Sequence, residues 1–383
     1  MRRITHVCLP HSTANHGHVQ QWWLQIDQQN RVVDLGLMPD GSAMAGESWR
    51  GDVLSPMGVD LQINGGLGLP FPELTEAALP QLLQLLDQLW RDGVEAISPT
   101  LVTCGVEPLR RALAVLRQAR EAHQPYRCQL LGAHLEGPFL AEARRGAHPR
   151  QHLASPSMAA LEARISGFEQ EIALVTLAPE LDGAATVIEH LRALGIRVAL
   201  GHSTADAKTA NEAFDRGVTM LTHSFNAMQG LHHRNPGPIG AACQRGDIAL
   251  GLIADGVHVD PTMAVLLQRL AGDQLVLVSD ALAPYGLEDG LHHWDERALL
   301  VADGTCRLED GTLAGVTLPL LEGVKRLARW GSDPVHAIHA ATVAPRKVLT
   351  AEATFQWLGR PLGELLRWHW DSKTNVLSWQ HAD

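Results

Sequence analysis

Residues 132–140 constrain the fold most, because they place a carboxylate at the end of a short apolar run. Residues 128–131 lead into the segment, and the Gly137-Pro138 pair interrupts it directly after Glu136. This pattern predicts a buried strand that ends at Glu136, with a loop beginning at the next residue. A carboxylate in such a position is costly unless it is paired, hydrogen-bonded or bound to a metal ion.

Three later segments repeat the arrangement of an apolar run followed by a polar side chain. Residues 198–201 precede His202, residues 218–222 precede His223, and residues 275–279 precede Asp280. The repetition predicts that one glutamate, two histidines and one aspartate stand at the ends of separate strands. Such a set is typical of a hydrolytic metal site.

From residue 59 onward, apolar runs alternate with amphipathic stretches. The runs cover residues 59–63, 94–101, 129–134, 172–177, 196–200, 218–221, 248–253 and 274–278, and the stretches include 75–90, 108–121, 182–194, 206–215 and 261–270. This alternation predicts an α/β fold, a parallel (β/α)8 TIM-type barrel. Barrel enzymes carry their chemistry at the C-terminal ends of the strands, where these polar residues fall.

The two ends of the chain have a different pattern, with short strand-like runs at 18–27, 31–35, 364–370 and 376–379. Neither end is long enough to form a stable sheet alone. We therefore expect a small β-sandwich domain built from both termini, residues 1–55 and 344–383, beside a barrel of residues 56–343. The glycine-rich stretch 226–240 is expected to be a loop of the barrel.

Composition excludes several classes of function. The formal net charge of −11 opposes a nucleic-acid or anionic-membrane surface. No apolar run approaches the roughly 20 residues of a membrane span, and no apolar segment follows the basic N-terminal residues as in a signal peptide. The five cysteines are scattered without C-x-x-C spacing, which opposes a disulfide framework. We expect a cytoplasmic protein.

Glu136, His202 and His223 form a ligand set that leaves a coordination position for water on a single divalent metal. Each histidine alone would be interpreted as a core or loop residue, but their shared position at strand ends favours ligation. Asp280 is then expected to act as general base toward the water and as acid toward the leaving group. The alternative for Asp280 is a helix N-cap, because residues 281–283 suit a helix.

Gln62 and Asn64 lie at the end of the first run, spaced so that both point the same way. Histidines at these positions would supply ligands for a second metal ion, whereas amides are poor zinc ligands. The sequence therefore predicts one metal ion with these two amides close to it.

Loops on the same face supply candidates for substrate binding. His258 follows another apolar run, Arg234 lies in the glycine-rich stretch, and Ala147-His148 follows two arginines. An arginine there is suited to a phosphate or a carboxylate. Asp260 before Pro261 is better explained as a helix N-cap.

The motifs that carry these residues resemble the amidohydrolase superfamily and, within it, the N-acetylglucosamine-6-phosphate deacetylase family. The matching segments are residues 58–66, 134–138, 201–204, 222–228, 254–260, 279–281 and 313–315, in the family's order and spacing. Two departures are Met57, where a proline is frequent, and Val316, where a serine is usual.

The resemblance implies a role for each matching residue. Glu136, His202 and His223 correspond to the metal ligands, Asp280 to the catalytic aspartate, and His148 to a histidine near the N-acetyl group. The implied substrate contacts are Ala147, His148, Asn226, Ala227, Arg234, His258, Leu313, Ala314 and Gly315. The family also implies a homodimer in which Arg234 serves the neighbouring subunit, and one divalent metal ion per subunit, zinc first, with iron, manganese and cobalt as alternatives.

The resulting hypothesis is a metal-dependent deacetylase of N-acetylglucosamine 6-phosphate in amino-sugar catabolism, with a small sugar phosphate as its partner. Three alternatives stay open. They are a deacetylase of the galactosamine epimer, an amidohydrolase of N-acyl amino acids, and a non-catalytic sugar-phosphate sensor.

Overall fold

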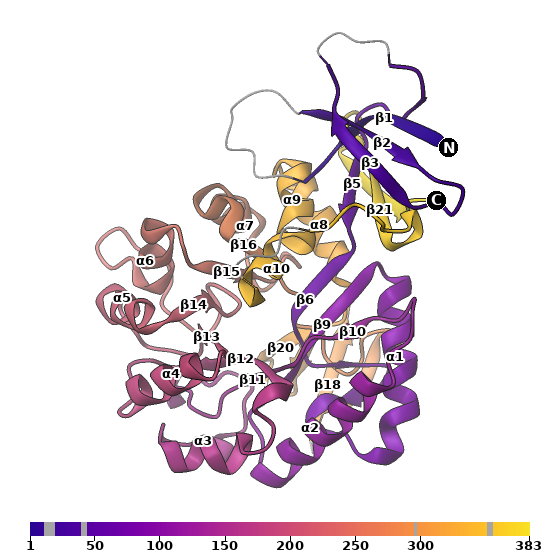
Figure 1. Cartoon of the computed structure of the whole chain (residues 1–383). Coiled ribbons are helices and arrows are strands. Elements are labelled where there is room, and N and C mark those ends of the chain that lie inside the picture. The colour runs from indigo at the N-terminus through magenta and orange to yellow at the C-terminus, as the bar shows by residue number, and fades with distance from the viewer. Residues whose placement is uncertain (11–19, 40–43, 295–296, 351–354) are drawn as a thin grey trace.

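The computed structural model describes residues 1–10, 20–39, 44–294, 297–350 and 355–383. The first two residues of the strand-like run 18–27 lie outside this part of the chain. A barrel surrounded by helices forms the larger part of the molecule, and a small β domain containing both termini lies beside α8 and α9 (Figure 1). The predicted barrel and the predicted β domain built from both termini are therefore confirmed, but the β domain is a single sheet and not a sandwich, because its strands pair edge to edge in one continuous order.

The barrel is a parallel sheet in which neighbours along the chain pair with each other. Its strands are β6 (Gly58–Ile63), β9 (Val94–Val102), β11 (Ala133–Glu136), β12 (Ile172–Leu177), β13 (Arg197–Leu200), β14 (Val218–Leu221), β15 (Ala249–Leu252) and β16 (Leu275–Leu277), with β10 (Gln129–Leu130) as a short extra strand on β9. The first strand meets the segment after the last one, where Asn64 N–H donates to Ala281 O at 2.7 Å and Asp280 N–H donates to Gln62 O at 2.8 Å. Barrel closure therefore brings Asp280 next to Gln62 and Asn64.

Helices cover the outside of the barrel with their apolar faces, except the last helix of the chain, whose Ala344 and Val348 share a separate apolar cluster with Val59 and Leu61 of the first barrel strand. They are α1 (Leu79–Arg91), α2 (Val106–Glu121), α3 (Met158–Ile165), α4 (Ala184–Ala193), α5 (Ala207–Arg216), α6 (Gly237–Arg245), α7 (Pro261–Ala271), α8 (Leu320–Arg329), α9 (Pro334–Thr342) and α10 (Ala344–Leu349). Asp260 caps α7 as predicted, since its carboxylate accepts from Thr262 N–H at 2.8 Å. The expectation that residues 226–240 form a loop is wrong at its end, because Gly237 begins α6 with Pro238 in the first turn, where no amide hydrogen is needed.

The small β domain joins both ends of the chain in one sheet. Its strands are β1 (Arg2–Cys8), β2 (Gln21–Ile26), β3 (Val32–Leu37), β4 (Glu47–Ser48), β5 (Val53–Pro56), β21 (Leu365–Asp371) and β22 (Val376–His381). The order β22-β21-β5-β1-β2-β3, with β4 on β1, is one continuous seven-stranded sheet. A separate apolar cluster around Leu24, Trp49 and Leu54 forms its core.

A second antiparallel sheet, which the sequence reasoning missed, is inserted after β16. It contains β17 (Gly290–Trp294), β18 (Arg297–Ala302), β19 (Thr305–Leu308) and β20 (Leu313–Val316). Leu282 N–H donates to Val316 O at 2.9 Å, which attaches the insertion beside Asp280. Another small hairpin, β7 (Gly65–Gly66) with β8 (Leu69–Pro70), follows β6.

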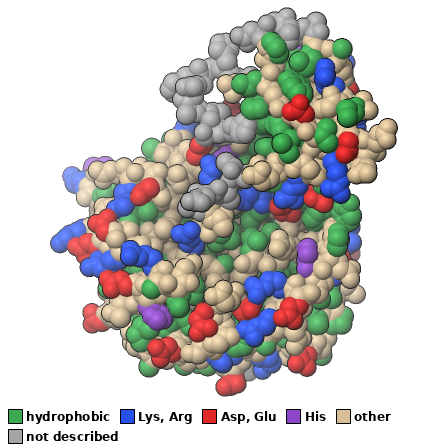
Figure 2. All heavy atoms as spheres, viewed as in Figure 1, with side chains coloured by type: hydrophobic (Ala, Val, Ile, Leu, Met, Phe, Trp, Pro, Cys, Tyr) green, Lys and Arg blue, Asp and Glu red, His purple; other side chains and the backbone are tan. Residues whose placement is uncertain are grey.

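The face in Figure 2 carries acidic and basic side chains interspersed over the barrel, without a large field of one sign. Among the described residues, no helix combines the length and the apolar character needed to cross a membrane.

Candidate active site

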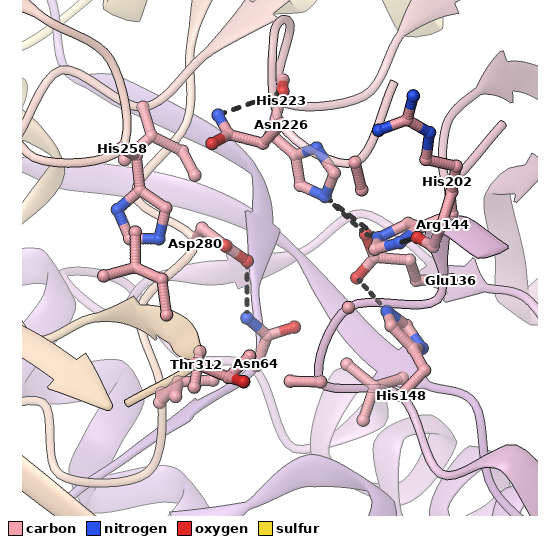
Figure 3. A pocket seen from close by; sticks show the side chains of 18 of the residues that line it. Asn64, Glu136, Arg144, His148, His202, His223, Asn226, His258, Asp280 and Thr312 are labelled. Carbon is pink, nitrogen blue, oxygen red and sulfur yellow. Dashed lines mark hydrogen bonds and ion pairs between the residues drawn. The ribbon is translucent and has the colours of Figure 1, made fainter. Parts of the chain in front are cut away.

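A cavity of about 360 Å³ opens at the C-terminal ends of the barrel strands. Its lining includes the predicted residues Asn64, Glu136, His148, His202, His223, Asn226, His258 and Asp280. Figure 3 shows Glu136 and its histidines on one side of this cavity and His258 on the other, with Asp280 and Asn64 between them. The strand ends therefore bring the predicted side chains together.

Glu136 is the last residue of β11, and three histidines surround its carboxylate. Its Oε1 lies 3.2 Å from His202 Nε2 and 3.1 Å from His223 Nε2, and these two nitrogens are 3.1 Å apart. His148 Nε2 lies 3.8 Å from Oε2. Nitrogen and oxygen atoms that converge in this way at a buried point suit a divalent metal ion such as zinc.

The charge balance of this cluster shows why a cation fits. Burial alone would raise the pKa of Glu136, but hydrogen bonds with His202 and His223 hold that pKa well below its ordinary value. Burial would likewise lower the pKa of His223, yet the carboxylate of Glu136 raises it. The carboxylate therefore requires positive charge at this point, either from a proton or from a metal ion.

The Nε2 atom of His202 faces the carboxylate of Glu136 and is available as a metal ligand. Its Nδ1 lies 2.8 Å from Arg144 O, which accepts a hydrogen from the ring and leaves the lone pair of Nε2 facing Glu136. Ligand atoms of Glu136, His148 and His202 all lie within 4.8 Å of one another, so His148 also belongs to the cluster. The buried cluster is thus a candidate metal site with four potential ligands.

Asp280 faces the cluster, and none of the described cationic side chains lies within hydrogen-bond distance of its carboxylate. Its Oδ1 accepts from Asn64 Nδ2 at 2.8 Å and from Gln62 Nε2 at 3.2 Å, and Gln62 Nε2 also lies 3.2 Å from Glu136 Oε1. Burial and the neighbouring carboxylate of Glu136 raise the pKa of Asp280 to about 6. Asp280 caps no helix, which removes the alternative considered from the sequence.

Three residues of the site have a backbone in the left-handed region, where residues other than glycine are uncommon. The φ angles are 48° at His202, 26° at His223 and 50° at Asp280. Each residue follows its strand by two or three positions, so the chain turns sharply to direct the side chain into the cavity. Backbone strain of this kind concentrates at functional sites.

His258 is held at the far side of the cavity by Asp255. The His258 ring approaches Asp255 Oδ2 through Nδ1 at 2.7 Å, and Asp255 Oδ1 accepts from His258 N–H at 2.8 Å. Asn226 and Ala227 line the cavity from the loop after β14. His258 lies across the cavity from the Glu136 cluster, whereas Asn226 lies beside His223 and donates to its backbone O at 3.3 Å (Figure 3).

The remaining predicted residues occupy different places. Ala147, Leu313 and Ala314 line the cavity, the last two from β20. Gly315 lies behind the wall, where a Cβ would stand 2.8 Å from Asp280 O, so its close approach serves the position of Asp280. Arg234 is exposed on its loop, and the structure does not bring it into the cavity of its own chain.

Comparison with known proteins places this site in a family. The model of the amidohydrolase family matches residues 53–353, which include the whole barrel. The chain belongs to the amidohydrolase family.

Curated amidohydrolases similar to this chain include deacetylases of two amino-sugar phosphates. The chain is 37% identical over 312 residues to N-acetylglucosamine-6-phosphate deacetylase of Bos taurus, covering 79% of this chain and 76% of the relative. It is 34% identical over 330 residues to the enzyme of the same name from Vibrio furnissii, covering 83% and 80%. It is also 34% identical over 332 residues to N-acetylgalactosamine-6-phosphate deacetylase of Escherichia coli O157:H7, covering 86% and 87%.

Solved structures of two similar enzymes match this chain over both the barrel and the β domain. The N-acetyl-D-glucosamine-6-phosphate deacetylase of Mycobacterium smegmatis, solved as a mutant with N-acetyl-D-glucosamine-6-phosphate, superposes with a TM-score of 0.79 at 26% identity, covering 100% of this chain and 98% of that one. The corresponding enzyme of Thermotoga maritima gives a TM-score of 0.80 at 26% identity, covering 98% and 96%.

Three residues of this amidohydrolase site were missed by sequence reasoning. Thr103 directly follows β9 and contacts His148, and Asp255 follows β15 and holds His258. Both could have been found by the same rule of a polar residue after a strand. Trp294, which closes the cavity from β17, belongs to the unpredicted insertion.

Proposed function

We propose that this amidohydrolase hydrolyses N-acetyl-D-glucosamine 6-phosphate to D-glucosamine 6-phosphate and acetate in amino-sugar catabolism. The observation that carries the proposal is the placement of the Glu136 cluster opposite Asp280 in one cavity, with His258 at its other side. Amide hydrolysis needs a polarised carbonyl, an activated water and a proton for the leaving nitrogen. The two sides of the cavity offer groups for these tasks and for the phosphate.

Glu136, His202 and His223 are proposed to hold one divalent metal ion. Their facing atoms lie 3.1 to 3.2 Å apart, near the roughly 3.4 Å edge of a tetrahedral zinc site. When bound, the ion supplies Lewis-acid chemistry for the carbonyl and the water, with zinc as first choice and iron, manganese or cobalt as alternatives. Gln62 and Asn64 donate to carboxylates instead of offering histidine nitrogens, which supports a single ion.

Asp280 is proposed to take the proton of the attacking water and to return it to the leaving nitrogen. With its pKa raised to about 6, it is ionised at neutral pH and still a usable acid after protonation. The amides of Asn64 and Gln62 hold its Oδ1, which leaves the second oxygen for the water. Neutral donors suit this task because they fix the carboxylate without suppressing its basicity as a cation would.

His148 is proposed to donate a hydrogen bond to the acetyl oxygen instead of binding the metal. His148 Nδ1 lies 3.0 Å from Thr103 Oγ1 and 3.3 Å from Thr103 N, so Thr103 holds the ring with Nε2 facing the cavity. Burial and the neighbouring His202 lower the pKa of His148 to about 3, so the ring is neutral. A neutral N–H donor stabilises the oxygen as negative charge develops on it.

The sugar phosphate is proposed to lie toward His258, Asn226 and Ala227. Leu313 and Ala314 form the wall beside the sugar, and Ala147 lies next to the acetyl site. Arg234 is exposed on the loop before α6, which suits a guanidinium that reaches the phosphate of a second subunit in a homodimer. The five cysteines are free, which accords with a reducing, cytoplasmic setting.

The galactosamine epimer is the second candidate, because a galactosamine 6-phosphate deacetylase matches 86% of this chain at 34% identity. The two substrates differ in the configuration of one hydroxyl. An N-acyl amino acid is less well suited, since it has no phosphate for His258 and Arg234.

Acetate release from four sugars tests the proposal. The panel contains N-acetylglucosamine and N-acetylgalactosamine, each with and without the 6-phosphate, and the metal content of the same preparation is measured. We expect turnover of the phosphorylated glucosamine with about one metal ion per chain. Faster turnover of the galactosamine phosphate would select the second candidate. Equal turnover without the phosphate would refute the phosphate site, and binding without turnover would indicate a sensor.

A further inference from the structure

A second and larger cavity, of about 530 Å³, lies where the small β domain meets the barrel. Helix α8 forms one wall with Lys325, Arg326, Arg329 and Trp330, and the turn before β22 forms another. The loop between β15 and α7 completes it with Asp255 and Gly256. Its size is in the range of small-molecule sites, which often lie between domains.

The wall from α8 has more positive charge than its neighbours neutralise. Lys325 Nζ pairs with Glu322 at 2.6 Å, and Arg326 lies 3.6 Å from the same carboxylate. The guanidinium of Arg329 is exposed and has no hydrogen bond or ion pair with any described residue. One carboxylate thus serves two cations while a third has none, which favours an anionic ligand.

Apolar side chains also line the cavity, both beside the cations at the end of α8 and from β22. Trp330 faces the backbone of Gly256, where a Cβ would stand 3.0 Å from the indole. Leu377 from β22 is buried behind the cavity. An anion with a flat or apolar organic part would therefore fit better than a bare ion.

One residue connects this cavity with the catalytic one. Arg326 Nη1 donates to Asp255 O at 2.6 Å in the second cavity. The carboxylate of the same Asp255, whose side chain is 2% exposed, holds the His258 ring at 2.7 Å. A ligand that draws Arg326 away from Asp255 O would alter the support of His258.

We propose that this second cavity binds a small phosphate monoester, and that binding changes the substrate affinity of the catalytic cavity through Arg326, Asp255 and His258. The phosphate is held by Arg329 and Lys325 with Arg326, since arginine forks and a lysine suit a doubly charged phosphate better than a single carboxylate. The organic part lies on Trp330. The binding half stands apart from the proposed deacetylation, whereas the effect on affinity rests on it.

Calorimetric titration of the full-length, metal-loaded protein with phenyl phosphate tests the binding half. Arg329→Glu reverses the unpaired charge, and Arg269→Glu on α7 is the matched control because Arg269 is exposed and lines neither cavity. We expect Arg329→Glu to weaken binding at least about tenfold and Arg269→Glu to leave it unchanged. Equal binding by all three proteins would overturn the proposal, because phenyl phosphate would then occupy the catalytic cavity only. Benzoate binding as tightly as phenyl phosphate would overturn the choice of a phosphate.

Steady-state kinetics in the presence of phenyl phosphate test the connection. We expect KM for the sugar phosphate to change about two- to fivefold at saturation in the wild type and in Arg269→Glu, but not in Arg329→Glu. A change in KM that persists in Arg329→Glu would reflect competition in the catalytic cavity and would overturn the connection. An unchanged KM in the wild type, with binding intact, would do the same. Binding is measured without turnover, so it stands even if the proposed substrate is wrong.

Discussion

Two aspartates with the same exposure show how the barrel and the small β domain differ. Asp52 in the β domain and Asp280 in the barrel are each 8% exposed. Asp52 accepts from Arg367 Nε at 2.7 Å and from His369 Nδ1 at 2.8 Å, so basic side chains contact both of its oxygens. Asp280 accepts from two neutral amides and faces a second carboxylate.

This difference separates a carboxylate with a structural role from one that we propose to be reactive. The β domain pairs its buried charge with side chains that fix the sheet, and no further chemistry follows from it. The barrel leaves its charge uncompensated at the strand ends, where a cation, a water and a substrate would complete the balance. The role of a buried carboxylate, structural or reactive, is thus better indicated by its hydrogen-bond and ion-pair partners than by its exposed fraction.

The largest effects are expected when the histidines beside Glu136 are removed one at a time. These variants test whether the barrel carboxylates belong to a metal site, in contrast to Asp52 of the β domain. We expect His223→Ala to lose the metal ion and to lower kcat at least about a thousandfold, because one of three ligands is missing. His148→Ala is the matched variant, and we expect it to retain about one metal ion per chain and to lose roughly a hundredfold in kcat. Metal analysis and acetate release measure both effects. Metal loss from the His148 variant alone would exchange the roles of the two histidines.

Removing a neutral donor would sharpen the account of Asp280. Asn64→Leu deletes the 2.8 Å hydrogen bond to Oδ1, and we expect kcat to fall about ten- to a hundredfold while the metal ion stays. Asn211→Leu on α5 is the control, because among the described residues its side-chain amide donates only to Ala207 O of the same helix. Equal rates for the two variants would show that Asn64 does not position Asp280.

The pH dependence tests whether Asp280 acts as a base. Its pKa is raised to about 6, so the ionised form predominates above that pH and the protonated form below it. We expect kcat/KM to fall about tenfold per pH unit on the acid side. The midpoint is expected at or below about 6, because a bound cation would partly offset the rise in the pKa of Asp280. A rate independent of pH from 4.5 to 7, with protein and metal intact, would be incompatible with this role.

The smallest effect is expected in the β domain. Asp52→Asn removes the charge that pairs with Arg367 and His369, both of which remain partly accessible to water. We expect the free energy of unfolding to fall by about 1 to 2 kcal/mol with kcat unchanged, as measured by denaturant unfolding and acetate release. A loss of activity in a folded Asp52→Asn protein would contradict the division between the two regions.

The barrel and the residues gathered at its candidate site were predictable because each signal is local. Glu136, His202, His223 and Asp280 each follow an apolar run, and parallel strands bring such positions to one end of a barrel. Thr103 and Asp255 obey the same rule, although their contacts depend on the partner histidine and are not visible in the sequence.

The inserted sheet was harder to predict because its core comes from distant residues. Leu299 and Cys306 in its strands are fully buried, whereas Leu291 and Leu300 on its outer face are exposed, so the alternation of apolar and polar residues is weak. The Asp303-Gly304 turn between β18 and β19 was the available signal. Arg234 could not be placed from sequence, since the reach of an exposed loop depends on what lies opposite it.

The most direct test of the central claim compares acetate release by the wild type and by Asp280→Asn, with the metal content of both proteins measured. Asparagine keeps the shape of the side chain and removes its charge. If Asp280 moves the proton, kcat for N-acetyl-D-glucosamine 6-phosphate falls at least about a thousandfold while the metal content and the melting temperature stay the same. A variant that retains both metal and turnover would contradict the account.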